Sequence, residues 1–225
     1  MSDNLTSKRI AIIDYGVGNL RSIENALSYI GVRSQIVSSP TLLETFSGII
    51  LPGVGAFGEG MKKIQIQGFV EVLKKWAEDG KPLLGVCLGM QLLFTSSDEQ
   101  GYQLGLNLIP GRVEKLKADL GSDQVVKIPH IGWNLLETPI GRTISEEVFL
   151  SNLKKEDKYY FVHSYACFPK VKSSILAYAS YGQNRFAAVV RDANVIGCQF
   201  HPEKSRDGGL RFLREYLKVV QEFQQ

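Results

Sequence analysis

The chain has 225 residues, of which 44% are hydrophobic and 22% are charged, and its formal net charge is +3. This composition excludes a disordered chain, and the length suits one large or two small domains. The charge is too small and too evenly spread to support nucleic-acid binding, although the calculated pI of 8.7 leaves that possibility open.

The chain begins with a polar segment over residues 1–8, which does not have the apolar stretch of a signal peptide. Further on, apolar runs stay short of the roughly 20 residues that span a bilayer. We therefore expect a polar tail over 1–8, one domain over 9–225 and a cytoplasmic location. The three cysteines are an odd, sparse set without metal-ligand spacing, so we expect no disulfide framework and no metal site. We also expect no cofactor.

The first half of the chain alternates short apolar runs with segments of helical spacing. The expected strands cover 9–14, 33–37, 48–51 and 81–84, and the expected helices cover 20–30, a short one opened by Ser39 as N-cap, 61–79 and 90–94. Such alternation is typical of a parallel α/β sheet. In these sheets ligands bind at the carboxyl ends of the strands.

Two glycine-rich segments follow expected strands. Residues 15–19 superficially resemble a dinucleotide-binding turn, but the third glycine and the later acidic residue are missing, so we favour a plain strand-to-helix turn. Residues 52–60 contain four glycines, which let backbone amides approach a ligand and turn toward an anion. A mobile connection is the alternative for this second loop.

Cys87 lies where the apolar run 81–84 turns into the expected helix 90–94, with Gly85 before it and Gly89 after it. This is the pattern of a nucleophile elbow with cysteine in place of serine. The amides at the start of the helix favour the reactive thiolate. A buried structural cysteine is the alternative, and we favour the nucleophile.

From about Ser96 the pattern changes to a polar loop over 96–101 and then to short strands. The strands are expected over 111–116, 125–128, 159–165, 174–181, 186–191 and 194–200, and a last helix begins at about Asp207. This half is expected to be mostly antiparallel, as an extension of the parallel sheet.

A nucleophilic cysteine needs a base, and the base needs an orienting group. His201 directly follows the expected strand 194–200, and Glu203 can return to its imidazole if Pro202 holds the turn. A histidine after a strand is commonly a surface or capping residue. Together with the elbow, however, Cys87, His201 and Glu203 form a candidate triad.

These residues carry a resemblance. The segment Gly85-Val86-Cys87-Leu88-Gly89-Met90-Gln91 with His201-Pro202-Glu203 resembles the class I, triad-type glutamine amidotransferases. Within them the chain is similar to the HisH family, the glutaminase subunits of imidazole glycerol phosphate synthase. That second resemblance is carried by Asp14-Tyr15-Gly16-Val17-Gly18-Asn19-Leu20, Pro52-Gly53-Val54-Gly55-Ala56-Phe57, Pro129-His130-Ile131-Gly132-Trp133-Asn134 and His201-Pro202-Glu203-Lys204-Ser205.

The resemblance implies a three-layer, flavodoxin-like α/β fold with a mainly parallel central sheet and an antiparallel extension in the second half. It also implies a reaction: Cys87 attacks the carboxamide of glutamine, His201 transfers the proton and Glu203 orients His201. The implied oxyanion hole comprises Gly53, Val54 and Leu88. The implied substrate contacts are Gly55, Gln91, Glu99, Ser164 and Tyr165.

The resemblance further implies a partner, a (β/α)8-barrel cyclase subunit of the HisF type that forms a heterodimer and receives the ammonia. Trp133, Asn134 and Lys204 match positions near that interface, although Trp133 could equally be an ordinary core aromatic. The family also suggests that the peptide between Gly53 and Val54 must be reshaped by the partner before the oxyanion hole forms. Gly53 permits such a change.

Three other functions fit parts of the pattern. A paralogous glutaminase that supplies ammonia for sugar amidation in surface polysaccharide synthesis would keep the same triad. A non-catalytic regulatory subunit would not need the intact Cys87, His201 and Glu203. A cysteine hydrolase of peptides would not be expected to carry the glycine-rich loop and the Trp133 motif.

Overall fold

The structure is a computed structural model that describes residues 9–118, 126–139 and 148–223, so the expected tail over 1–8 lies outside it. The helices are α1 (Leu20–Tyr29), α2 (Phe57–Ile66), α3 (Phe69–Glu78), α4 (Leu88–Leu92) and α5 (Arg206–Phe223), with short 3-10 helices η1 (Pro40–Thr45), η2 (Val148–Leu150), η3 (Lys172–Ser174) and η4 (Pro202–Lys204). The strands are β1 (Arg9–Ile13), β2 (Arg33–Val37), β3 (Gly48–Leu51), β4 (Leu83–Val86), β5 (Phe94–Ser97), β6 (Gln103–Leu104), β7 (Ile109–Lys115), β8 (His130–Leu135), β9 (Lys158–His163), β10 (Tyr165–Pro169), β11 (Ile175–Tyr181), β12 (Asn184–Asp192) and β13 (Val195–Cys198).

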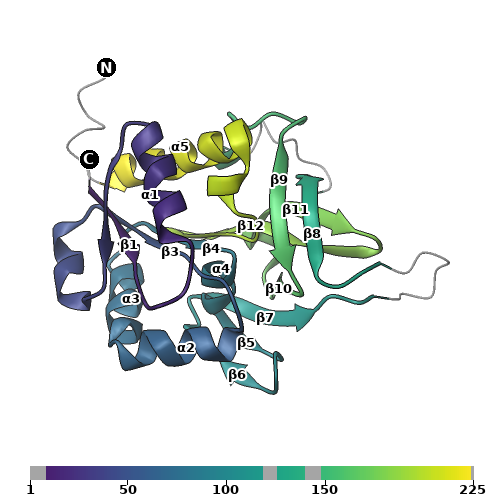
Figure 1. The fold of residues 1–225 in the computed structure, drawn as a ribbon, viewed down its shortest axis with the longest axis horizontal. Helices are drawn as coiled ribbons and strands as arrows, with labels where there is room; N and C mark the ends of the chain where they lie inside the picture. Colours follow the sequence, from purple (N-terminus) through teal and green to yellow (C-terminus); the bar gives the residue numbers. More distant parts are fainter. Residues whose placement is uncertain (1–8, 119–125, 140–147, 224–225) are drawn as a thin grey trace.

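The main sheet has the strand order β2-β1-β3-β4-β13-β12-β10-β7-β5-β6, with β11 paired to β12 (Figure 1). Strands β2, β1, β3, β4 and β13 are parallel neighbours. Beyond β13 most pairs are antiparallel, and β8 and β9 form a separate antiparallel pair. The parallel α/β sheet with an antiparallel extension is therefore confirmed.

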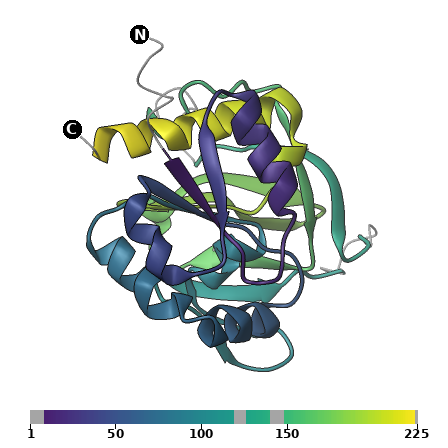
Figure 2. The ribbon, with the colours of Figure 1, turned by 60° about the vertical axis from the view of Figure 1, so that its left-hand side comes forward.

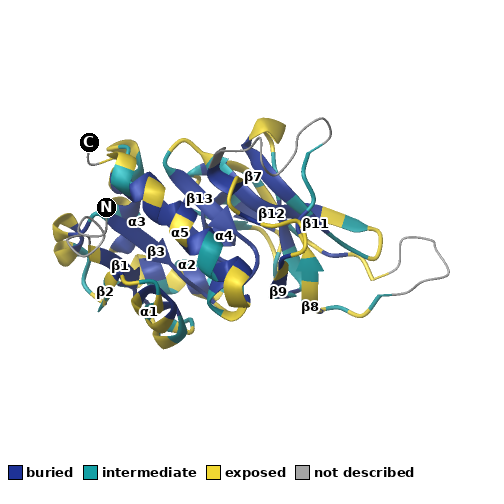
Figure 3. Cartoon of the chain, turned by 90° about the horizontal axis from the view of Figure 1, so that it is seen from above, coloured by how far each residue is buried: buried dark blue, intermediate teal, exposed yellow. Residues whose placement is uncertain are grey.

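Helices cover both faces of the parallel sheet, with α1 and α5 on one side and α2 and α3 on the other (Figures 1 and 2). The strands are buried from both sides, as Figure 3 shows for β1, β3 and β13. In β1, Ile10 and Ile12 join the core under α1 and α5, whereas Ala11 and Ile13 join the core over α2 and α3. This alternation explains why the parallel strands read as continuous apolar runs.

The expected helix over 61–79 is two helices, which is a correction. The first begins earlier, at Phe57, and the second begins at Phe69. Gly68 between them has φ of +75°, which a right-handed helix cannot contain. The short helix after Ser39 is a 3-10 helix, and the Ser39 side chain makes no capping hydrogen bond.

Three further expectations need correction. Phe94, expected at the end of a helix, begins strand β5, which also takes up part of the expected polar loop over 96–101. The expected strand 159–165 is broken at Ser164 into β9, which pairs with β8, and β10, which pairs with β7. Residue 125 of the expected strand 125–128 lies outside the described residues, and residues 126–128 do not form a strand.

Within the described ranges, no helix combines the length and apolar character needed to cross a membrane.

Candidate active site

Three neighbouring parallel strands bring the candidate residues to one edge of the sheet. Strand β3 pairs with β4, and β4 pairs with β13, with Val86 opposite Cys198. The glycine-rich loop follows β3, and Cys87 follows β4 directly. His201 lies three residues after the end of β13, because this strand ends at Cys198 and not at residue 200 as expected. Segments more than 100 residues apart in sequence thus meet because the strand order places their carboxyl ends together.

Cys87 occupies a strained backbone position between β4 and α4. Its φ is +55° and its ψ is −109°, outside the regions that ordinary residues favour. The close approach of the Leu51 backbone explains why position 89 is a glycine. A Cβ on Gly89 would lie 1.8 Å from the carbonyl oxygen of Leu51, so no larger residue fits. The geometry is that of the nucleophile elbow expected from the sequence.

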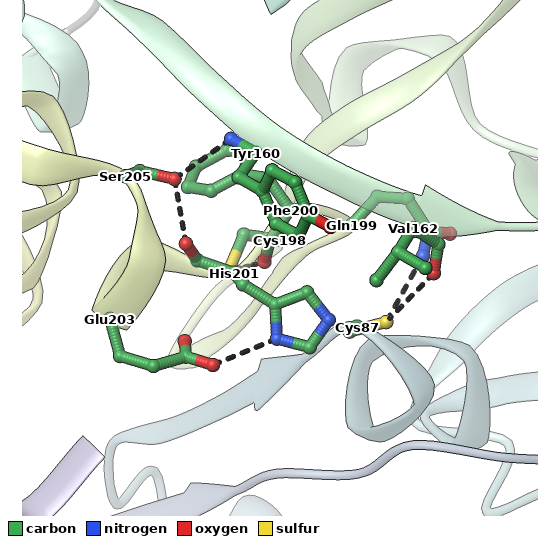
Figure 4. Close-up of polar contacts among 9 residues, drawn as sticks. All are labelled: Cys87, Tyr160, Val162, Cys198, Gln199, Phe200, His201, Glu203 and Ser205. Atoms are coloured by element: carbon green, nitrogen blue, oxygen red, sulfur yellow. Dashed lines mark hydrogen bonds and ion pairs between the residues drawn. The ribbon is translucent and has the colours of Figure 1, made fainter. Parts of the chain in front are cut away.

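His201 and Glu203 form a buried pair next to Cys87. The Nδ1 atom of His201 lies 2.8 Å from Oε1 of Glu203, and both side chains are almost fully buried. Figure 4 shows the other ring nitrogen directed toward Cys87. Among the described residues this nitrogen, Nε2, has no hydrogen-bond partner. The ring is thus oriented by the carboxylate on one side and presented to the sulfur on the other.

The electrostatics of this pair favour a charged imidazole. Burial of the ring acts to lower the pKa of His201, but its interactions with Cys87 and Glu203 outweigh burial and raise the pKa to about 10. An imidazole with a raised pKa can accept the proton of the cysteine thiol. A thiolate beside an imidazolium is the form of cysteine that attacks carbonyl groups.

The glycine-rich loop is held in one specific arrangement. The amide nitrogen of Leu88 donates to the carbonyl oxygen of Gly53 at 3.3 Å. The hydroxyl of Tyr15 donates to the carbonyl oxygen of Pro52 at 2.6 Å. A Cβ on Gly53 would lie 2.3 Å from that hydroxyl oxygen, so the position admits only glycine. The Leu88 amide, expected to stabilise an oxyanion, is therefore occupied by the loop itself.

A cavity of about 330 Å³ opens beside Cys87. Its lining includes Val54, Gly55, Cys87, Leu88, Gln91, Glu99, Ser164 and Tyr165, all predicted from the sequence. The carboxylate of Glu99 also accepts a hydrogen bond from the amide of Phe57 at 2.7 Å, so it caps α2 as well. The cavity has the size and mixed polarity of a small-molecule site.

The residues expected at the partner interface are only partly brought together. Trp133 is 40% exposed and packs edge-on against Tyr160, whose ring lies 5.7 Å from Nζ of Lys204. Tyr160 in turn lies near His201, with a ring separation of 6.5 Å. Asn134 points to the other face of β8 and donates to the carbonyl oxygen of Ser180 at 2.6 Å.

Four residues at the site were not identified from the sequence. Tyr15 holds the glycine-rich loop and Gln199 contacts the sulfur of Cys87. His163 lines the cavity and forms a buried pair with His130. The contacts all join segments distant in the chain, so local pattern gives no signal for them. Position is the one signal: Tyr15 and His130 lie within motifs quoted for the resemblance, Gln199 lies two residues before His201, and His163 directly precedes Ser164, an implied substrate contact.

Residues 11–218 match the family model described as "Glutamine amidotransferase class-I". The chain therefore belongs to the class I glutamine amidotransferase family. The fold agrees, because a "Crystal structure of glutamine amidotransferase" matches with a TM-score of 0.71 over 94% of this chain and 98% of that one. The "Structure of PurLQS from Thermotoga maritima" matches with a TM-score of 0.68 over 97% and 99%. At 21% and 19% identity these two matches establish the fold alone.

Curated relatives place the chain more narrowly. It is 43% identical to "Imidazole glycerol phosphate synthase subunit HisH" of Syntrophotalea carbinolica, over 92% of this chain and 98% of the relative. The subunits of the same name from Caldanaerobacter subterraneus and Moorella thermoacetica are 43% and 40% identical over 94% of this chain, and 98% and 95% of their own lengths are covered. Within the amidotransferases, the chain belongs to the HisH family.

Proposed function

We propose that this chain is the glutaminase subunit of an imidazole glycerol phosphate synthase and that it hydrolyses glutamine to glutamate and ammonia. The observation that carries the proposal is the convergence of Cys87 on its strained turn with the buried pair of His201 and Glu203. The HisH relatives favour this function over the supply of ammonia for sugar amidation and over a non-catalytic role.

The reaction begins with a proton transfer from the thiol of Cys87 to Nε2 of His201. The thiolate attacks the side-chain carbonyl carbon of glutamine in the 330 Å³ cavity. The tetrahedral intermediate collapses when the carbon–nitrogen bond breaks, and His201 returns its proton to the leaving ammonia. Water, deprotonated by the same imidazole, then attacks the glutamyl thioester, releases glutamate and restores the thiol. Glu203 holds the imidazole in orientation throughout.

Each tetrahedral intermediate places a negative oxygen near the glycine-rich loop. A hole for it would comprise the amides of Leu88 and Val54, but the carbonyl oxygen of Gly53 occupies the Leu88 amide at 3.3 Å. We infer that the peptide joining Gly53 and Val54 must turn over before the reaction is fast. Losing one such donor typically slows catalysis about 100- to 1000-fold. The chain alone should therefore be a slow glutaminase.

The word subunit in the relatives' names implies a second chain. We propose that it is a HisF-type (β/α)8-barrel cyclase, joined as a heterodimer, which receives the ammonia. Trp133 and Lys204, both in contact with Tyr160, are proposed to lie at that interface. Asn134 is directed away from them, so we propose an internal role for it instead.

The proposal is tested by replacing the nucleophile. Cys87→Ala and Cys87→Ser should lower glutamine hydrolysis by at least about 1000-fold, since neither replacement side chain can form the thioester. Cys167→Ala is the matched control, because Cys167 is fully buried and lies outside the cavity lining. Hydrolysis that survives the loss of Cys87 would overturn the assigned mechanism.

A further inference from the structure

A buried glutamine touches the sulfur of the nucleophile. Gln199 lies just after β13 and has no solvent exposure. Its Nε2 atom lies 3.9 Å from Sγ of Cys87, and Figure 4 shows the amide directed at the sulfur. Its Oε1 atom accepts a hydrogen bond from Nε2 of Gln91 at 3.1 Å. A side-chain amide is costly to bury, so its two contacts need an explanation.

The carbonyl oxygen of Tyr165, which can only accept hydrogen bonds, fixes the orientation of the side-chain amides of Gln91 and Gln199. Nε2 of Gln91 also donates to the carbonyl oxygen of Tyr165 at 2.9 Å. Because a carbonyl cannot donate, the nitrogen of Gln91 must face it. The group that Gln91 meets in Gln199 must then be the oxygen. The nitrogen of Gln199 is therefore left to face Cys87, and the sulfur receives a hydrogen-bond donor.

The same carbonyl is fixed from its other side. Nδ1 of His163 lies 2.9 Å from the oxygen of Tyr165, so that ring nitrogen carries the hydrogen. Nε2 of His163 then accepts from Nδ1 of His130 at 3.0 Å. Burial lowers the pKa of His163 to about 3 and that of His130 to about 4, so both rings are neutral. From His130 through His163, Gln91 and Gln199 to the sulfur of Cys87, each donor in the series therefore meets an acceptor.

We propose that Gln199 is a further catalytic residue, which donates a hydrogen bond to the sulfur of Cys87 whenever that sulfur carries negative charge. Gln91, His163 and His130 act as positioning residues, because they fix the direction of the Gln199 amide through the Tyr165 carbonyl. The sulfur is charged before it attacks glutamine and again when the thioester is cleaved. Hydrogen bonds to charged groups are about twice as strong as neutral ones. The contact therefore stabilises the charged sulfur at both of these steps.

The role in turnover rests on the proposed glutaminase function, but the contact itself can be tested without it. Iodoacetamide alkylates a thiolate, so its rate with Cys87 reports the charged form directly. Gln199→Met keeps the volume and removes the donor, and it should slow alkylation near pH 7 about tenfold. Gln199→Glu keeps an acceptor for Gln91 but places a second oxygen at the sulfur, and it should slow alkylation further.

The control is Gln35→Met, which makes the same substitution on the outermost strand β2 and leaves the network intact. It should alkylate like the unaltered protein over the whole pH range. The other titratable groups that interact with Cys87 are His201, Tyr15, Cys167 and Cys198, and both Gln199 variants leave them unchanged. In the variants the pH at half-maximal alkylation should therefore rise because of Gln199 alone.

Folded Gln199→Met that alkylates like the unaltered protein at every pH would overturn the proposal, as would Gln199→Glu reacting faster than Gln199→Met. A measurement on the unaltered chain removes any dependence on how the variants fold. The side-chain amide protons of Gln199 should shift in NMR spectra with the same pH midpoint as alkylation. No shift, or the same shift in Cys87→Ala, would also refute the contact. Failure of glutamine hydrolysis with the alkylation results intact would refute only the glutaminase function.

Discussion

The amide nitrogen of Leu88 donates to the carbonyl oxygen of Gly53, with 3.3 Å between the two atoms. Leu88 follows the nucleophile, so its amide points to where an oxyanion would form. In this arrangement the nucleophile and its base are in place while the donor for the intermediate is occupied. The two halves of the catalytic machinery are thus separable, and each can be tested by itself.

The hydroxyl of Tyr15 fixes the start of the glycine-rich loop. Tyr15→Phe removes its hydrogen bond to the buried carbonyl of Pro52, which should lower the free energy of unfolding by about 1–2 kcal/mol in urea denaturation. Because the carbonyl next to Gly53 is then no longer held, the degree to which the partner stimulates glutamine hydrolysis should also change.

Tyr216→Phe provides the matched control for that substitution. Its buried hydroxyl donates to the carbonyl oxygens of Ile49 and Pro82, at the opposite ends of β3 and β4 from the site. Tyr216→Phe should lower stability by a similar amount and leave stimulation unchanged. Equal stimulation in both variants would show that Tyr15 is only a core residue.

Glu203 supports the charge on His201. Glu203→Gln removes the carboxylate and should lower glutamine turnover about 100- to 10,000-fold, since a misoriented base is a poor proton carrier. The pKa of His201 should fall from about 10, because one of the two groups that raise it is gone. NMR titration of the His201 ring measures this directly. An unchanged titration with normal turnover would remove Glu203 from the triad.

The neutral pair of His130 and His163 predicts acid sensitivity. Their pKa values in the folded chain are about 4 and about 3, below the ordinary 6.5. Between these values and 6.5 the unfolded chain binds more protons, so stability is fully present above pH 6.5 and falls as the pH drops toward 4 and 3. His130→Phe keeps the ring stacking but removes one titrating group. It should reduce the slope of the free energy of unfolding against pH by at most about 1.4 kcal/mol per pH unit.

Urea denaturation at a series of pH values measures that slope. Tyr181→Phe serves as the control, since the Tyr181 ring stacks on His130 at 4.1 Å but its hydroxyl donates elsewhere, to the carbonyl of Lys127. It should leave the slope as it is. If His130→Phe has the slope of the unaltered chain, His130 is not held neutral by the fold.

The sequence is most informative where local chemistry alone determines structure. The buried apolar strands predict the parallel sheet, and the glycine after Cys87 predicts the tight turn because a Cβ there would strike the Leu51 carbonyl. His201 and Glu203 are two residues apart and meet through a single turn. For these elements, short-range sterics and spacing suffice.

Other features depend on tertiary arrangement and escape local pattern. The break at Ser164 arises because β9 pairs with β8 while β10 pairs with β7, a choice that apolar spacing does not reveal. Contact between Gln199 and Cys87 joins residues 112 apart and requires β4 and β13 to be neighbours. The direction of Asn134 likewise depends on which face of β8 packs inward.

Trp133 offers a test of the proposed interface. Trp133→Ala should weaken binding of the HisF-type barrel at least tenfold by calorimetry, because exposed aromatic side chains often dominate association. Tyr102→Ala is the control, since Tyr102 is 69% exposed on the turn between β5 and β6. Equal binding by both variants would place the interface elsewhere on the molecule.

Glutamate release from glutamine is the most direct measurement of the proposed function. It should be followed for the purified chain alone and with a HisF-type barrel plus that barrel's nucleotide substrate, each beside the Cys87→Ala variant. We expect slow release by the chain alone, at least about 100-fold faster release in the complex, and none with Cys87→Ala. Fast release by the chain alone would show that the hydrogen bond from the Leu88 amide to the Gly53 carbonyl does not restrain catalysis. Release unaffected by Cys87→Ala would contradict the assigned active site.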